Sequence, residues 1–320
     1  MSSRRLAVAA AALAVIVVPV GSPAEPPAGP DTVAAVDAAT GAIGQVIAVG
    51  RDPLLLTAAA GRVWALNVAD GTLSMIDPSS GTEKRLPLRE TVGVASGGAA
   101  VWVAYDGNRL ARLDGRTGSV VRTFRIGGKR LFRLRDSGFL AFGGDSLWLT
   151  IPVLGQPNRR QQLARIDPAS GRILAKVAIP GDPSVPLVVG SNVWILGRVD
   201  NTLTRVAQDS LRARSIPLDV LPFGVASGAG SLWVAHDFGR SIWRIDPRSL
   251  RVLARIKLGQ RTRGVAYGRG RVWATTETDL VALDPRTNRG VRRTTLSLPR
   301  HDDGPIGVAV LGGTVWVSVE

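Results

Sequence analysis

The amino-acid sequence predicts an all-β fold: a seven-bladed β-propeller built from four-stranded antiparallel blades. Two observations predict it. An aliphatic residue followed by Trp recurs at intervals of about 40 residues, a repeat length typical of propeller blades. The two ends of the repeat region also carry complementary halves of one unit. The recurring pairs are Val63-Trp64, Val101-Trp102, Leu147-Trp148, Val193-Trp194, Leu232-Trp233, Val272-Trp273 and Val315-Trp316.

Each repeat consists of four short apolar runs separated by turns, which we call strands a to d from first to last. Runs this short, rich in Val, Leu and Ile and bounded by turn residues, are typical of strands and not of helices. An Asp follows strand c in most units, as in Ile245-Asp246. Its carboxylate is suited to accept a backbone N–H two residues further on, so we expect it to form the c–d turn.

Strand b is apolar on both faces. It reads Val-Trp-Val from Val101 to Val103, a pattern expected of a blade packed between two neighbours. The recurring Trp is therefore expected to fill the layer between blades and not to face a ligand. Trp243 is an exception because it lies in strand c, where we expect it to fill a local gap.

The apolar runs at the two ends determine the number of blades. Residues 32–50 contain only strands c and d of a unit, and residues 304–320 contain only strands a and b. Six complete units and one shared unit give seven blades, the last closed by the N- and C-terminal strands. The same repeat can build an open solenoid, but complementary half-units favour a closed ring. We assign residues 31–320 to this one domain.

The N-terminal segment is expected to direct export. Residues 1–24 have a basic start, an apolar run and a small-residue end, as a signal peptide does. The apolar run is short for a membrane span, and an uncleaved anchor is the alternative. Residues 25–30 are expected to be a flexible spacer. The protein is thus predicted to be secreted or associated with the cell envelope, where a chain without Cys depends on packing for stability.

The chain is strongly basic, with 40 Lys and Arg against 25 Asp and Glu and a formal net charge of +15. A polyanion partner would explain the excess, and so would a coding bias toward Arg combined with a solvated surface. The Arg residues are spread along the whole chain, which favours the second explanation. We expect a monomer and, for an exported protein, no nucleic-acid partner.

Function is expected on the face that carries the b–c loops and d–a links, because these segments vary between units. Two insertions there place cations among apolar residues. Such a mixture can bind an unknown protein or an anionic envelope ligand, or make peripheral contact with a membrane; the alternative is a solvated loop anchored by Phe132. The cations are Lys129, Arg130, Arg133, Arg135, Arg159 and Arg160.

Ionisable residues of the same face are a second candidate site. His236 is expected in the b–c loop of the fifth unit, and Glu277 and Asp279 in that of the sixth. His301 lies in the following link. His236, Glu277 and Asp279 can hold a divalent cation, while the two His residues can do acid–base work. The alternative is that all four are solvated, since their spacing matches no established metal motif.

The motif GVASGGAAVWV, followed by an Asp turn and a further apolar run, resembles the bacterial YVTN/streptogramin-lyase-like propeller superfamily over nearly all of residues 31–320. The resemblance implies a propeller that acts as an exported binding or sensor module. Streptogramin lyases open a cyclic depsipeptide by elimination with Mg²⁺, using a His in one blade and a Glu-x-His in the next. His236 corresponds to the first His and Glu277 to the Glu. Asp279 stands where the second His is expected, so His301 would supply the base.

The favoured prediction is therefore an exported propeller that binds a ligand or protein partner at the envelope, without catalysis and without a cofactor. The alternative is a Mg²⁺-dependent, streptogramin-lyase-like carbon–oxygen lyase. The sequence leaves the identity of the ligand open.

Overall fold

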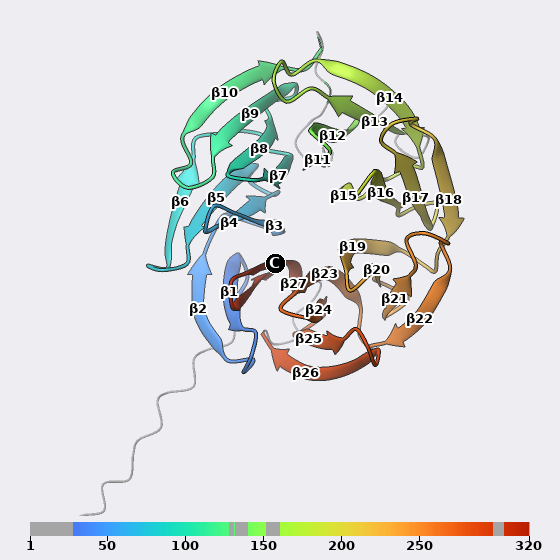
Figure 1. Ribbon diagram of the computed structural model, residues 1–320. Coiled ribbons are helices and arrows are strands. Elements are labelled where there is room, and N and C mark those ends of the chain that lie inside the picture. The colour runs from blue at the N-terminus through green and yellow to red at the C-terminus, as the bar shows by residue number, and fades with distance from the viewer. Residues whose placement is uncertain (1–27, 128–130, 132–139, 152–160, 297–303, 320) are drawn as a thin grey trace, which may run out of the picture.

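The computed structural model describes residues 28–127, 131, 140–151, 161–296 and 304–319. The described strands, β1 to β28, form seven four-stranded antiparallel sheets. These sheets surround a central axis (Figure 1), which confirms the predicted seven-bladed β-propeller. In the described part of the chain, no helix is long and apolar enough to cross a membrane.

Each blade extends from strand a at the central channel to strand d at the rim, and blade 1 begins with β3. The strands a are β3 (Pro53–Ala59), β7 (Gly93–Gly97), β11 (Leu140–Gly143), β15 (Leu187–Val189), β19 (Pro222–Gly228), β23 (Thr262–Gly268) and β27 (Pro305–Leu311). The strands b are β4 (Arg62–Asn67), β8 (Ala100–Tyr105), β12 (Ser146–Ile151), β16 (Asn192–Gly197), β20 (Ser231–His236), β24 (Arg271–Thr276) and β28 (Thr314–Val319).

The outer half of each blade completes the sheet. The strands c are β5 (Thr72–Asp77), β9 (Arg109–Asp114), β13 (Gln161–Ile166), β17 (Thr202–Ala207), β21 (Ser241–Ile245), β25 (Asp279–Asp284) and β1 (Thr32–Asp37). The strands d are β6 (Thr82–Leu86), β10 (Val120–Arg125), β14 (Ile173–Ile179), β18 (Ala213–Pro217), β22 (Val252–Lys257), β26 (Arg289–Thr295) and β2 (Ile43–Ala48).

Blade 7 joins the two ends of the described chain. Its strand order is β27-β28-β1-β2, so β1 pairs antiparallel with β28. The register places Val33 opposite Ser318 and Ala35 opposite Trp316. The complementary half-units of the sequence are thus one sheet, and this sheet closes the ring.

Apolar clusters of buried residues lie between every pair of neighbouring blades, blades 7 and 1 included. The recurring Trp of strand b belongs to one of these clusters in each blade, with an exposed fraction of 3% or less. Burying an aromatic side chain of this size contributes roughly 2–3 kcal/mol. The Trp residues therefore hold neighbouring blades together, as predicted.

An Arg on strand c adds a polar connection between blades. Arg244 lies 5.3 Å from the centre of the Trp233 ring and donates from Nη1 to the Pro285 carbonyl of the next blade at 2.7 Å. Arg165 in blade 3 makes the equivalent contacts with Trp148 and the Gln208 carbonyl of blade 4. The side chain covers the indole while its guanidinium satisfies a turn carbonyl. This connection is not among the features predicted from the sequence.

The Asp at the c–d turn forms that turn, as predicted. In six blades its carboxylate accepts the N–H two residues further on at 2.8 to 3.1 Å. Hydrogen bonds within the turn are the main cause that lowers the pKa of these carboxyls. The residues are Asp37, Asp77, Asp114, Asp167, Asp246 and Asp284.

The inner strands of blades 6 and 7 approach each other closely. The N–H of Gly264 in β23 donates to Thr275 Oγ1 at 2.7 Å, and that hydroxyl donates to the Ile306 carbonyl in β27 at 3.0 Å. A Cβ atom on Gly264 would overlap the Ile306 carbonyl oxygen. Only glycine therefore allows this bridge between the two blades.

We expect Gly264→Ala to lower the free energy of unfolding by about 2 kcal/mol, because the added methyl group forces two packed backbones apart. Denaturant titration followed by Trp fluorescence measures it. Gly313→Ala is the matched control, since an added Cβ there meets nothing within 4 Å, and it should change the free energy by less than about 0.5 kcal/mol. Equal stability of the two variants would contradict the steric explanation.

Candidate functional site

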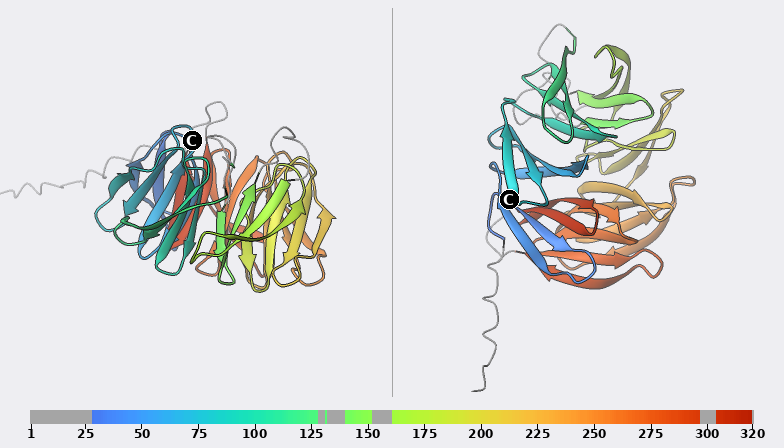
Figure 2. Two further views of the ribbon diagram at one scale, coloured as in Figure 1. Left: turned by 90° about the horizontal axis from the view of Figure 1, so that it is seen from above. Right: turned by 60° about the vertical axis from the view of Figure 1, so that its left-hand side comes forward.

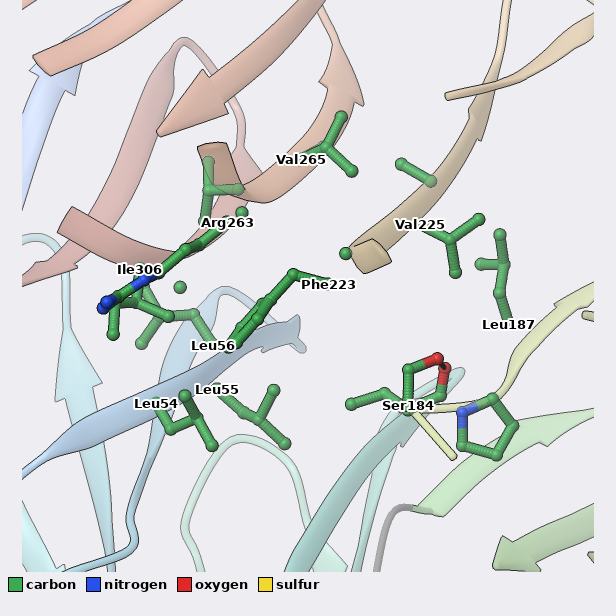
Figure 3. Close-up of a pocket in the computed structure, with 18 of the residues that line it drawn as sticks. Leu54, Leu55, Leu56, Ser184, Leu187, Phe223, Val225, Arg263, Val265 and Ile306 are labelled. Carbon is green, nitrogen blue, oxygen red and sulfur yellow. Dashed lines mark hydrogen bonds between the residues drawn. The ribbon is translucent and has the colours of Figure 1, made fainter. Parts of the chain in front are cut away.

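A cavity of about 370 Å³ lies in the central channel. Strands a of blades 1, 5, 6 and 7 line it together with the segment leading into β15 of blade 4 (Figure 3). Arg198, which follows β16, adds a further side chain of blade 4. The strands run between the two faces of the ring (Figure 2), and most of the lining residues lie near the starts of strands a. The cavity therefore occupies the half of the channel next to the b–c turns and d–a links, the face on which the sequence analysis expected function.

The wall of the cavity is mainly apolar. Figure 3 shows Leu54, Leu56, Val225, Val265 and Ile306 around the space. This composition follows from the repeat, because strand a of most blades consists of small and aliphatic residues. Ligand pockets of about 300–1,000 Å³ with mostly apolar walls and a few polar groups accommodate small organic molecules. The size and lining of this cavity fit such a ligand at the small end of the range.

A cation and an aromatic ring lie together on the wall near blades 4 and 5. Arg198 Nε is 2.8 Å from Asp182 Oδ2, and its guanidinium lies 5.1 Å from the centre of the Phe223 ring. Arg198 and Phe223 both line the cavity. The ion pair and the ring hold this guanidinium in one orientation at the wall.

A second cationic group comes from blade 6. Asp237, whose side chain is only 3% exposed, accepts from Arg261 Nε at 2.6 Å and from Arg261 Nη2 at 2.9 Å. Its other neighbour is Arg263 Nε, 3.6 Å from Oδ2. Arg263 lies along the cavity wall beside Ile306 (Figure 3). The buried carboxylate thus positions an Arg that reaches the cavity.

The lining is suited to binding. Among the described lining residues, the charged side chains are Arg198 and Arg263. A guanidinium has several N–H donors and no acceptor, so these side chains can donate hydrogen bonds to a ligand. The hydroxyl of Ser184 accepts the Leu196 N–H at 3.1 Å and donates to the Val185 carbonyl at 3.2 Å, which is a role in backbone structure.

His236 is the last residue of β20 and not a loop residue, which corrects the position expected from the sequence. It pairs in register with Ser241, the first residue of β21. The side chain is fully buried and packs on Trp243 with ring centroids 4.8 Å apart. Burial lowers the pKa of His236 to about 4, so the ring is neutral at pH 7.

Asp279 is also a strand residue, the first of β25, and it is buried. Its carboxylate accepts hydrogen bonds from Arg293 Nη1 and from Thr295 Oγ1. A charged carboxylate that is buried in the interior of a blade requires such partners. Glu277 is exposed. The described residues contain no group of three or more His, Asp or Glu side chains suited to a metal ion. His236, Glu277 and Asp279 do not form such a group. A Mg²⁺ site at these residues stays a prediction from the sequence.

Several other predicted site residues lie outside the described residues. The same is true of the predicted signal peptide, residues 1–24. Their roles stay predictions from the sequence. The site residues concerned are Lys129, Arg130, Arg133, Arg135, Arg159, Arg160 and His301.

Function is predicted on loops from the sequence, and the cavity is not predicted. The available signal was the recurring Gly-Val-Ala of strand a, as at Gly224 to Ala226, because small residues next to the axis leave space there. The volume depends on how the blades meet around the axis, and no local pattern reports that quantity.

No family model matches the chain, and no curated protein matches its sequence. Solved structures resemble it in fold. Kuenenia stuttgartiensis hydrazine synthase matches with a TM-score of 0.62 and 16% identity over 83% of this chain and 90% of that chain. Apo AztD from Citrobacter koseri matches with a TM-score of 0.58 and 12% identity over 83% and 95%. The Cps50 (Swd1) β-propeller domain of Myceliophteria thermophila matches with a TM-score of 0.61 and 12% identity over 86% and 98%. At such identities the similarity shows the propeller fold alone.

We expect the free energy of unfolding to fall by about 2 kcal/mol between pH 7 and pH 4.5 because of His236. In the unfolded chain its pKa returns to 6.5, so unfolding takes up a proton that the buried ring, with a pKa of about 4, does not bind. The stabilisation is complete above about pH 6.5 and is lost as the pH falls toward 4. Denaturant titrations across this range measure the effect.

His236→Phe is the comparison variant, since it keeps an aromatic ring on Trp243 and removes the titrating group. The free energy of unfolding of this variant should depend much less on pH than that of the native protein. If both proteins lose the same stability, His236 is not the group responsible.

Proposed function

We propose that the protein is an exported binding module of the cell envelope whose central channel takes up a small, largely apolar ligand. The cavity carries this proposal: about 370 Å³ of mainly apolar space formed by the inner strands. Export rests on the sequence of residues 1–24, which has the pattern of a signal peptide.

Binding would be driven by burial of apolar surface against the leucine and valine side chains of the wall, at roughly 25 cal/mol per Å² before the costs of association. Arg198 and Arg263 are positioned to orient a polar end of the ligand. The inner strands hold the cavity wall in place before binding. This reduces the entropy that the protein loses when the ligand binds.

The streptogramin-lyase-like alternative has less support. It requires His236 to bind Mg²⁺, yet this ring is fully buried against Trp243. It also requires a base, and Asp279 is paired with Arg293 and Thr295. The alternative therefore depends on His301 alone as the base.

The anionic dye 8-anilinonaphthalene-1-sulfonate, an apolar probe, tests the proposal. We expect saturable binding to the native protein with increased fluorescence. Leu54→Trp places a large ring in the cavity and should weaken dye binding at least about tenfold, equivalent to about 1.4 kcal/mol.

Leu253→Trp is the matched control, because Leu253 is 54% exposed on the outer strand β22. It should bind the dye as the native protein does. Absence of saturable binding to the native protein, or equal binding by the two variants, would remove the channel as the site.

A further inference from the structure

The outer strands of blades 2 to 6 carry positive charges and no negative ones. Their sequences are VVRTFR in β10, ILAKVAI in β14, ARSIP in β18, VLARIK in β22 and RGVRRTT in β26. These strands follow one another along the rim of the ring (Figure 1). We call this surface the outer wall.

Each of the five strands contributes an exposed cation that makes no ion pair or hydrogen bond among the described residues. Such side chains are available to an external partner without first breaking an internal interaction. They are Arg125, Lys176, Arg214, Lys257 and Arg289.

Protection of sheet edges explains only part of this pattern. Outer strands are edges, and charges on them prevent pairing with other chains. That role requires charged side chains, but they need not all have the same sign. The outer strand of blade 1, β6, has both signs, with Glu83 beside Lys84 and Arg85. Many of the acidic residues instead occupy c–d turns, where their carboxylates accept turn N–H groups. Five successive cationic edges therefore indicate a partner.

We propose that the outer wall binds a flexible, linear, phosphate-rich polymer. Guanidinium groups match phosphate oxygens through paired hydrogen bonds. The strands that carry the cations follow the convex outside of the ring (Figure 1), and a flexible chain can follow that curve across several blades. Duplex nucleic acid, with a persistence length of about 50 nm, would touch only a short part of it. This site is separate from the channel and does not rest on the ligand proposed there.

Long-chain inorganic polyphosphate is the probe. Its binding to the full-length protein is measured at several salt concentrations, with poly-glutamate and duplex DNA as competitors. The wall variant carries Arg125→Gln, Lys176→Gln, Arg214→Gln, Lys257→Gln and Arg289→Gln. The control variant removes the same charge from exposed positions on the face of the a–b and c–d turns. It carries Arg116→Gln, Arg172→Gln, Arg248→Gln, Arg269→Gln and Arg286→Gln.

We expect the wall variant to bind polyphosphate at least about tenfold more weakly and with a smaller salt dependence, because fewer counterions are released. The control variant should weaken binding by less than about threefold. If both variants weaken polyphosphate binding equally, net charge alone explains the effect and the outer wall is not the binding site. If poly-glutamate or duplex DNA binds more tightly than polyphosphate, the ligand is not a flexible phosphate-rich polymer.

Thermal melting verifies that both variants fold. If the wall variant does not fold, Arg214→Gln and Lys257→Gln are measured singly, and each should weaken polyphosphate binding about twofold. Unchanged affinity in both single variants would overturn the proposal.

Discussion

The pairing of β1 with β28 is the constraint on which the rest of the structure depends. No blade buries its Trp within its own sheet, because each apolar cluster lies between two blades. Without β1 and β2, blade 7 would be half a sheet, and the clusters it shares with blades 6 and 1 would lose part of their residues. The central cavity also exists only when the ring is closed, since blades 7 and 1 both line it.

One repeat produces different surfaces at different radii. Strand a is mostly small and apolar, strand b carries the Trp that packs between blades, and strand d of blades 1 to 6 carries charged side chains. The sequence of each layer follows from its surroundings: limited space at the axis, a neighbour on both sides in the middle, and water at the rim. An apolar cavity and a charged outer surface thus arise from the same unit without a separate domain for either.

Sequence patterns were sufficient for the fold because its determinants are local and repeated. Trp64 and its equivalents mark strand b, and Asp77 and its equivalents mark the c–d turn. Side-chain environments were less accessible. His236 is predicted in a loop, yet it is the last residue of β20 and its ring is fully buried against Trp243. The cavity could not be predicted because it depends on how separate blades meet, a quantity that no single stretch encodes.

The closing strand also determines the face of the ring on which both chain ends of the propeller lie. Thr32 begins β1 opposite Val319, the last residue of β28, and Val319 also pairs with Pro305 at the start of β27. Both termini of the ring therefore leave from the side on which the channel cavity lies. Anything joined to the chain ahead of Thr32 is therefore attached on the face of the channel opening, and the hairpin turns lie on the opposite face.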